Sequence, residues 1–174
     1  CGIIGIISEE EVSSSIYESL TVIQHRGQDA AGMATLEDGK LHVRKQIGLV
    51  REVFRAQHIK NLKGKMGIGH VRYPTAGGVT REFSQPLYVN SPYGISICHN
   101  GNLVNSKELT QELYENDLRH LNTDSDSEVI LNIFANEMQK INSQSPSPEE
   151  IFSAVEKMHL RLKGAYSVVL MISG

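Results

Sequence analysis

Cys1–Ile7 reads CGIIGII, and this stretch decides how the rest of the chain is interpreted. A short uncharged run of isoleucine and glycine predicts a buried strand. A free amino-terminal cysteine also places a thiol and an α-amine on one residue. An α-amine with a pKa of about 7.7–8.0 can act as a local base near neutral pH. The stretch therefore predicts a nucleophile held at the edge of a sheet; the alternative is that Cys1 is only a chain terminus.

The composition is that of an ordinary globular domain. The chain has 174 residues, of which 40% are hydrophobic and 21% charged, and its formal net charge is −3. This charge gives no electrostatic reason to expect a nucleic acid or an anionic membrane as partner. The chain has no apolar run of the roughly 18 residues that a membrane helix needs, and its start lacks the basic segment of a signal peptide. We therefore expect a cytoplasmic protein.

Metal and disulfide frameworks are not expected. The only cysteines are Cys1 and Cys98, too few for a disulfide framework or a four-thiolate metal site. Cys98 lies in an apolar run and is expected to be a small buried side chain. The histidines, among them His70 and His99, do not have the spacing of metal ligands, and each is more simply explained as a hydrogen-bonded structural residue.

Hydrophobic spacing and turn residues predict hairpins mixed with helices. Apolar residues at helical spacing from Val12 to Ile23 predict a helix that has ended by Gly27. Asp38-Gly39 lies between two strand-like runs and predicts a hairpin. Further strands are expected at 2–7, 66–71, 95–99 and 165–172. This mixture is typical of an α+β protein with largely antiparallel sheets.

Two capping boxes predict the later helices. Ser125 with Glu128 opens a helix that carries Ile130, Ile133, Phe134 and Ile141 on one face. Ser147 with Glu150, and Pro148 at the first helical position, open a second helix that is expected to stop at Gly164. The chain then ends just after an apolar strand, and a domain rarely ends on such an edge. We therefore expect these residues to be the first part of a longer protein.

Several polar residues have both a structural and a chemical interpretation. Asn100-Gly101 after a strand is a plain turn, or a pair of donors for the oxyanion that develops in acyl transfer. Arg72, which follows its strand, is either a surface charge or a planar guanidinium that binds a substrate carboxylate. Asp126 at the start of a predicted helix caps the helix dipole, or binds a substrate cation. Taken singly, none of these residues decides a function.

The motifs taken together are far more specific. They are, in order, CGIIGI at 1–6, QHRGQDAAG at 24–32, GIGHVRYPTAG at 67–77, QP at 85–86, YVNSPYG at 88–94, HNGNL at 99–103 and NTDSDSE at 122–128. This series resembles the class II glutamine amidotransferases along the whole chain, most weakly over 108–121 and 139–156. The resemblance implies a four-layer αββα amino-terminal nucleophile (Ntn) hydrolase fold. Residues 1–174 would then be a glutaminase domain that is incomplete at its carboxyl end.

The resemblance implies a catalytic set of three residues. The Cys1 thiol attacks the carboxamide of glutamine, and the Cys1 α-amine takes the thiol proton. The Asn100 side-chain amide and the Gly101 N–H hold the oxyanion.

The resemblance also implies a substrate-binding set. Arg72, helped by the Thr75 hydroxyl, pairs with the α-carboxylate of glutamine, and Asp126 pairs with the α-ammonium. Gly27 lies in a loop that is expected to approach the substrate or the nucleophile closely. Arg26 and His70 are also expected to belong to the substrate site.

Tyr73-Pro74 and residues 90–94 favour one branch of this class, the one that makes phosphoribosylamine from phosphoribosyl pyrophosphate (PRPP) at the start of purine synthesis. For this branch the resemblance implies a downstream phosphoribosyltransferase domain that binds PRPP and Mg²⁺, no cofactor in the present segment, and a homo-oligomer at full length. The alternatives are the glutaminase domain of another class II member such as glucosamine-phosphate synthase, an Ntn amidohydrolase for another substrate, and a non-catalytic regulatory domain. Arg72 with Asp126 suits a free α-amino acid, and Cys1 with Asn100 and Gly101 favours a catalytic domain.

Overall fold

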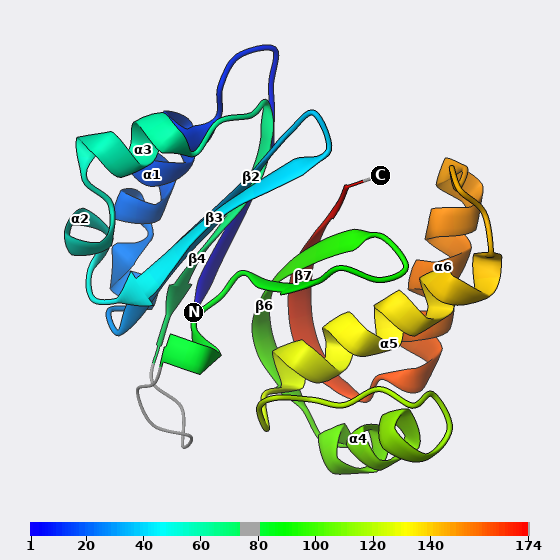
Figure 1. Cartoon of the computed structure of the whole chain (residues 1–174). Coiled ribbons are helices and arrows are strands. Elements are labelled where there is room, and N and C mark those ends of the chain that lie inside the picture. The colour runs from blue at the N-terminus through cyan, green and yellow to red at the C-terminus, as the bar shows by residue number, and fades with distance from the viewer. Residues whose placement is uncertain (74–80, 174) are drawn as a thin grey trace.

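Two antiparallel sheets lie face to face between two groups of helices in the computed structural model, which describes residues 1–73 and 81–173 (Figure 1). The first sheet has the order β1-β4-β2-β3, with β1 at Gly2–Ile7, β4 at Met66–Arg72, β2 at Ala30–Glu37 and β3 at Lys40–Ile47. The second has the order β5-β6-β7, with β5 at Leu87–Val89, β6 at Gly94–Leu103 and β7 at Gly164–Ser173. All the strand pairs are antiparallel, which confirms the α+β prediction.

The helices cover the outer faces of the two sheets. The first sheet carries α1 (Ser13–Val22), α2 (Val50–Val53) and α3 (Ala56–Asn61), and the second carries α4 (Ser106–Glu115), α5 (Asp126–Ile141) and α6 (Pro148–Arg161). Short 3-10 turns lie at Gln24–Arg26 and Arg81–Phe83. The resulting layer order, helix–sheet–sheet–helix, is the αββα arrangement that the resemblance implied.

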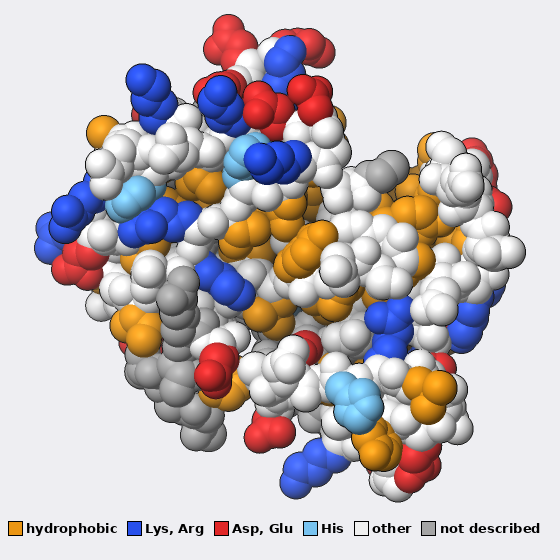
Figure 2. Space-filling view, viewed as in Figure 1, with side chains coloured by type: hydrophobic (Ala, Val, Ile, Leu, Met, Phe, Trp, Pro, Cys, Tyr) orange, Lys and Arg blue, Asp and Glu red, His pale blue; other side chains and the backbone are white. Residues whose placement is uncertain are grey.

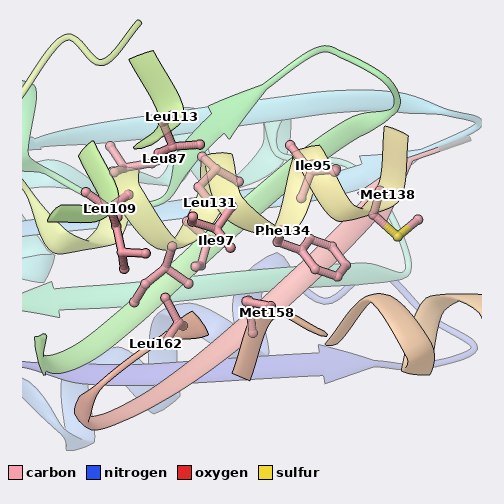
Figure 3. Packing of buried hydrophobic residues seen from close by; sticks show 14 of the residues in the cluster. Leu87, Ile95, Ile97, Leu109, Leu113, Leu131, Phe134, Met138, Met158 and Leu162 are labelled. Carbon is pink, nitrogen blue, oxygen red and sulfur yellow. The ribbon is translucent and has the colours of Figure 1, made fainter. Parts of the chain in front are cut away.

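Among the described residues, three apolar clusters hold the four layers together. Ile16, Leu20 and Met33 belong to the cluster between α1–α3 and the first sheet, and Cys98 and Met171 to the one between the two sheets. The largest cluster joins the second sheet to α4–α6 and includes Ile97 of β6 and Phe134 of α5 (Figure 3). In Figure 2 apolar side chains gather along the middle of the molecule, and charged side chains lie mostly toward its periphery. No helix in the described part of the chain is long and apolar enough to span a membrane.

Local sequence signals explain most of the element boundaries. Asp38 and Gly39 both take positive φ angles, 48° and 75°, and they form the tight turn of the β2–β3 hairpin. Ser147 Oγ accepts from the Glu150 N–H at 3.3 Å and the Glu150 carboxylate accepts from the Ser147 N–H at 2.8 Å, so the capping box of α6 is confirmed. Cys98 is fully buried between the sheets, as expected.

Two helix predictions need correction. α5 does not bury one face: every residue from Ser127 to Met138 is buried, because α5 packs against β5, β6, α4 and α6. α6 ends at Arg161, and Gly164 does not stop it. Gly164 instead begins β7 with a φ of 152°, where a side chain would collide with the carbonyl oxygen of Asn102.

Candidate active site

A cavity of about 360 Å³ lies where strands of both sheets meet the start of α5. Its lining includes four of the predicted site residues, which come from separate parts of the chain: Cys1, Arg72, Gly101 and Asp126. The other described residues that line it are Tyr73, Phe83, Gln85, His99, Asn102, Asp124, Ser125 and Ser127. The cavity therefore brings together a thiol, a cationic side chain, a glycine in a strand and a carboxylate.

Strand pairing places Cys1 beside Arg72. In the β1–β4 pair Gly2 lies opposite Val71, so the residues just before Gly2 and just after Val71 lie at the same end of the sheet. Arg72 is buried, and its guanidinium carbon lies 5.5 Å from the centre of the Phe83 ring. The cation is thus held in place at the wall of the cavity.

The surroundings of the Cys1 α-amine lower its pKa. Partial burial lowers its pKa from the usual value of 8.0, and the positive charge of Arg26 lowers the pKa further. Arg26 is itself exposed, and its Nε donates to the Cys1 carbonyl oxygen at 2.9 Å. A larger fraction of this amine is therefore unprotonated at neutral pH than in an unstructured peptide. Arg26 lies next to Cys1 but is not among the residues that line the cavity.

Gly27 and His70 also lie behind the cavity lining. A Cβ on Gly27 would come within 2.5 Å of the Arg72 carbonyl carbon, so the close approach that requires glycine here is to the backbone of β4. His70 is fully buried, and burial lowers its pKa to about 3, which keeps the ring neutral. Thr75 lies outside the described residues.

Asn100 and Gly101 are part of a strand and do not form a turn after one. β6 continues to Leu103, and Asn100 and Gly101 pair with Ser167 and Tyr166 of β7. Gly101 has a φ of 146°, and a side chain there would collide with the carbonyl oxygen of Ala165. Gly101 lines the cavity, whereas Asn100 is half-buried beside it and is not part of the lining. The turn interpretation of this pair is therefore wrong.

Asp126 is fixed by its position on α5 and by β6. It is the first residue of the helix, and its Oδ2 accepts from the backbone N–H of Leu103 at 2.7 Å. Ser125 is the N-cap residue, as predicted, and its hydroxyl oxygen accepts from the Ser127 N–H at 3.2 Å.

Glu128 does not complete the predicted capping box. Its buried carboxylate accepts from the backbone N–H groups of Asn122 and Thr123, both at 2.8 Å, and from the Thr123 hydroxyl at 2.7 Å. The Ser125 N–H, which a capping box would use, donates to Thr123 Oγ1 at 3.2 Å. The preceding loop offers the carboxylate several donors where the N-cap offers one, so Glu128 orders the loop that carries Asp124.

A buried group of polar side chains lies at the wall of the cavity, and the sequence analysis assigned no role to most of it. It consists of His70, Gln85, His99 and Ser127. Gln85, with Pro86, is part of the motif series that carries the resemblance, but no local signal shows that its side chain reaches His99. Among the described residues, no three His, Cys, Asp or Glu side chains converge as a metal site would require.

The four-layer fold, with an amino-terminal cysteine in a cavity at the end of its strand, is that of an Ntn hydrolase domain. Residues 78–173 match the family model of the glutamine amidotransferase domain, and the chain belongs to this family.

Relatives and solved structures agree with this family. The chain is 56% identical over 174 residues to the amidophosphoribosyltransferase of Pseudomonas aeruginosa, covering 100% of this chain and 35% of that protein. A structure described as the allosteric regulatory enzyme of purine biosynthesis matches 99% of this chain and 36% of its own, with a TM-score of 0.84 and 36% identity. Glutamine PRPP amidotransferase from B. subtilis, complexed with ADP and GMP, matches 99% of this chain and 35% of its own, with a TM-score of 0.81 and 34% identity. The chain thus spans about a third of the length of the relatives that it matches.

Proposed function

We propose that this chain hydrolyses glutamine to glutamate and ammonia through a thioester on Cys1. The observation that carries the proposal is the single cavity that collects Cys1, Gly101, Arg72 and Asp126. A cation and a carboxylate in one cavity suit the two charges of a free α-amino acid. The thiol and the strand N–H suit attack on its side-chain amide.

The reaction begins with transfer of the thiol proton to the Cys1 α-amine, and the sulfur attacks the carboxamide carbon. The oxygen of the tetrahedral intermediate accepts hydrogen bonds from the Asn100 side-chain amide and the Gly101 N–H. The protonated α-amine of Cys1 then gives its proton to the departing amide nitrogen. Ammonia leaves, and a thioester between Cys1 and the substrate remains. Water adds to the thioester, the carbon–sulfur bond breaks, and glutamate and the Cys1 thiol are released.

The residues that bind the α-amino acid group of glutamine are different from those that carry out the reaction. The Arg72 guanidinium takes the α-carboxylate, assisted by Thr75, and Asp126 takes the α-ammonium. The Asp126 carboxylate keeps one oxygen for this contact, since only Oδ2 accepts from Leu103 among the described residues.

We propose further that the ammonia is used to make 5-phosphoribosylamine from PRPP. The names of the relatives support this acceptor, and a phosphoribosyltransferase domain that binds PRPP with Mg²⁺ would lie in the part of those relatives that this chain does not span. The segment described here would need no cofactor of its own. A cytoplasmic location and a homo-oligomer at full length complete the proposal.

The function is tested by comparing two reagents that label Cys1. We expect a glutamine-like diazoketone to label Cys1 stoichiometrically and glutamine to slow the labelling. Arg72→Lys and Asp126→Asn should slow diazoketone labelling and lower kcat/KM for glutamine about 10-fold or more, because a hydrogen bond to a charged ligand group contributes about 1.5–3 kcal/mol. Iodoacetamide has no α-amino acid group, so its reaction with Cys1 should stay near the wild-type rate in both variants.

Arg51→Lys, at an exposed arginine of α2, is the matched control. Equal losses with both reagents would contradict the assignment of Arg72 and Asp126 to substrate binding.

The pH profile tests the base. kcat/KM for glutamine should rise with pH and level off above an apparent pKa that is lower than 8.0, because only the unprotonated α-amine accepts the thiol proton. Arg26→Ala removes a charge that lowers this pKa, so its profile should shift to higher pH. Arg26→Lys keeps a positive charge and should shift the profile less. Identical profiles for wild type and Arg26→Ala would show that Arg26 does not influence the titrating base.

A further inference from the structure

The side-chain amide of Gln85 pairs with the backbone of His99 as a neighbouring strand would. Gln85 Oε1 accepts from the His99 N–H at 2.6 Å, and Gln85 Nε2 donates to the His99 carbonyl oxygen at 3.3 Å. Both residues are buried, with 6% and 4% of their surfaces exposed. His99 immediately precedes the proposed oxyanion residues Asn100 and Gly101.

The register of the second sheet explains why this pairing is needed. β5 pairs with β6 from Leu87 opposite Ile97 to Val89 opposite Ile95, so a longer β5 would place residue 85 opposite His99. The backbone of Gln85 instead lies on β2, where a side chain on Gly32 would collide with the Gln85 carbonyl oxygen. Lys45 of β3 donates to the carbonyl oxygens of Ser84 and Pro86 at 2.8 and 2.9 Å. The main chain of this segment is thus held on the first sheet, and the Gln85 side chain reaches the second.

The hydrogen positions of the buried group follow from its geometry. Because Gln85 Oε1 faces an N–H, the Nε2 end is the donor, and it also donates to Ser127 Oγ at 3.0 Å. The Ser127 hydroxyl can then donate to His99 Nδ1 at 2.8 Å, and burial lowers the pKa of His99 so that its ring stays neutral. His70 Nε2 lies 3.1 Å from the His99 carbonyl oxygen and donates to it. His99 is therefore held through its backbone N–H, its carbonyl and its ring.

This pairing also indicates the direction of the Gly101 N–H. Successive N–H groups of a strand point to opposite edges, so the N–H groups of His99 and Gly101 share one edge of β6. The His99 N–H points to Gln85, away from β7. The Gly101 N–H therefore also points away from β7, at the edge of β6 where the cavity lies.

We propose that Gln85 is a positioning residue for the oxyanion site: its amide replaces the missing strand beside His99 and so fixes the orientation of Asn100 and Gly101. This inference rests on the proposed glutaminase function. Gln85 acts through the backbone of His99, so its contribution belongs to the step in which the oxyanion forms and not to the binding of glutamine.

The test compares Gln85→Met with Asn105→Leu in this protein. Asn105 is a second buried amide that bridges backbone groups, since its Nδ2 donates to the Arg161 carbonyl oxygen and its Oδ1 accepts from the Lys163 N–H, both at 3.0 Å. It does not line the cavity. Both variants should lower the midpoint of thermal unfolding. Gln85→Met alone should lower kcat for glutamine, by about 10-fold or more, with KM changed less than about twofold.

Two further measurements separate the possible outcomes. Iodoacetamide reacts by displacement and needs no oxyanion donor, so Cys1 of Gln85→Met should react at the wild-type rate. Ser127→Ala removes one support of the Gln85 amide and should lower kcat by about threefold, which decides the question if Gln85→Met fails to fold. The positioning role would be overturned if Gln85→Met and Ser127→Ala had the same kcat as Asn105→Leu. An increase in KM alone would overturn it as well. A wild-type protein that releases no glutamate would instead contradict the proposed function.

Discussion

Cys1→Ser is expected to lower the rate of glutamine hydrolysis to less than about one thousandth of the wild-type rate, because the hydroxyl of serine is a far weaker nucleophile than a thiol beside the same base. The fold should be unchanged, since Cys1 is only half-buried and the two side chains differ by one atom. The measurement is glutamate release, with thermal unfolding as the check on folding.

A residue added ahead of Cys1 should have the same effect for a different reason. It converts the α-amine into an amide, which cannot accept the thiol proton, although the thiol remains. Cys98→Ala is the control, because Cys98 is fully buried between the sheets and burial raises its pKa, so its loss should leave the activity unchanged. Wild-type glutamate release from the extended variant would refute the role of the α-amine.

Asn100→Ala is expected to lower kcat for glutamine by about 10²–10³ with little change in KM, because an oxyanion donor acts on charge that develops in the transition state. Asn90→Ala, at an exposed asparagine that precedes β6, should have no effect on either constant. An increase in KM without a loss of kcat would make Asn100 a contact to the bound substrate. Steady-state kinetics of the three proteins are sufficient to decide.

The fold could be predicted where local sequence and local structure agree. Asp38-Gly39 specifies its turn through backbone conformation alone. Ser147 and Glu150 accept hydrogen bonds from each other's backbone N–H groups at the start of α6. Glu128 obeys the same sequence rule but forms different bonds, because the loop at 122–123 competes for its carboxylate. Local periodicity also predicted a single apolar face for α5, and it could not show that neighbouring elements surround the helix.

In the candidate site, too, some residues could be predicted from the sequence and others could not. Cys1, Arg72, Gly101 and Asp126 were named from motifs, and the cavity brings these four together. Gln85 is also part of a motif, but the motif gave its side chain no role, because that side chain performs a backbone function beside a residue 14 positions away. Such a pairing between a side chain and a distant backbone depends on where the two sheets place the main chain. It cannot be predicted from residue type alone.

The hydrogen bonds of Glu128 have a consequence for the kinetics of substrate binding. With the backbone of Asn122 and Thr123 tied to a buried carboxylate, the segment that leads to Asp126 is ordered before any ligand arrives. The conformational entropy of this segment is therefore lost during folding, and binding does not have to restrict it again. This wall of the cavity should accordingly add no slow rearrangement to the association with glutamine, which the time course of binding can show.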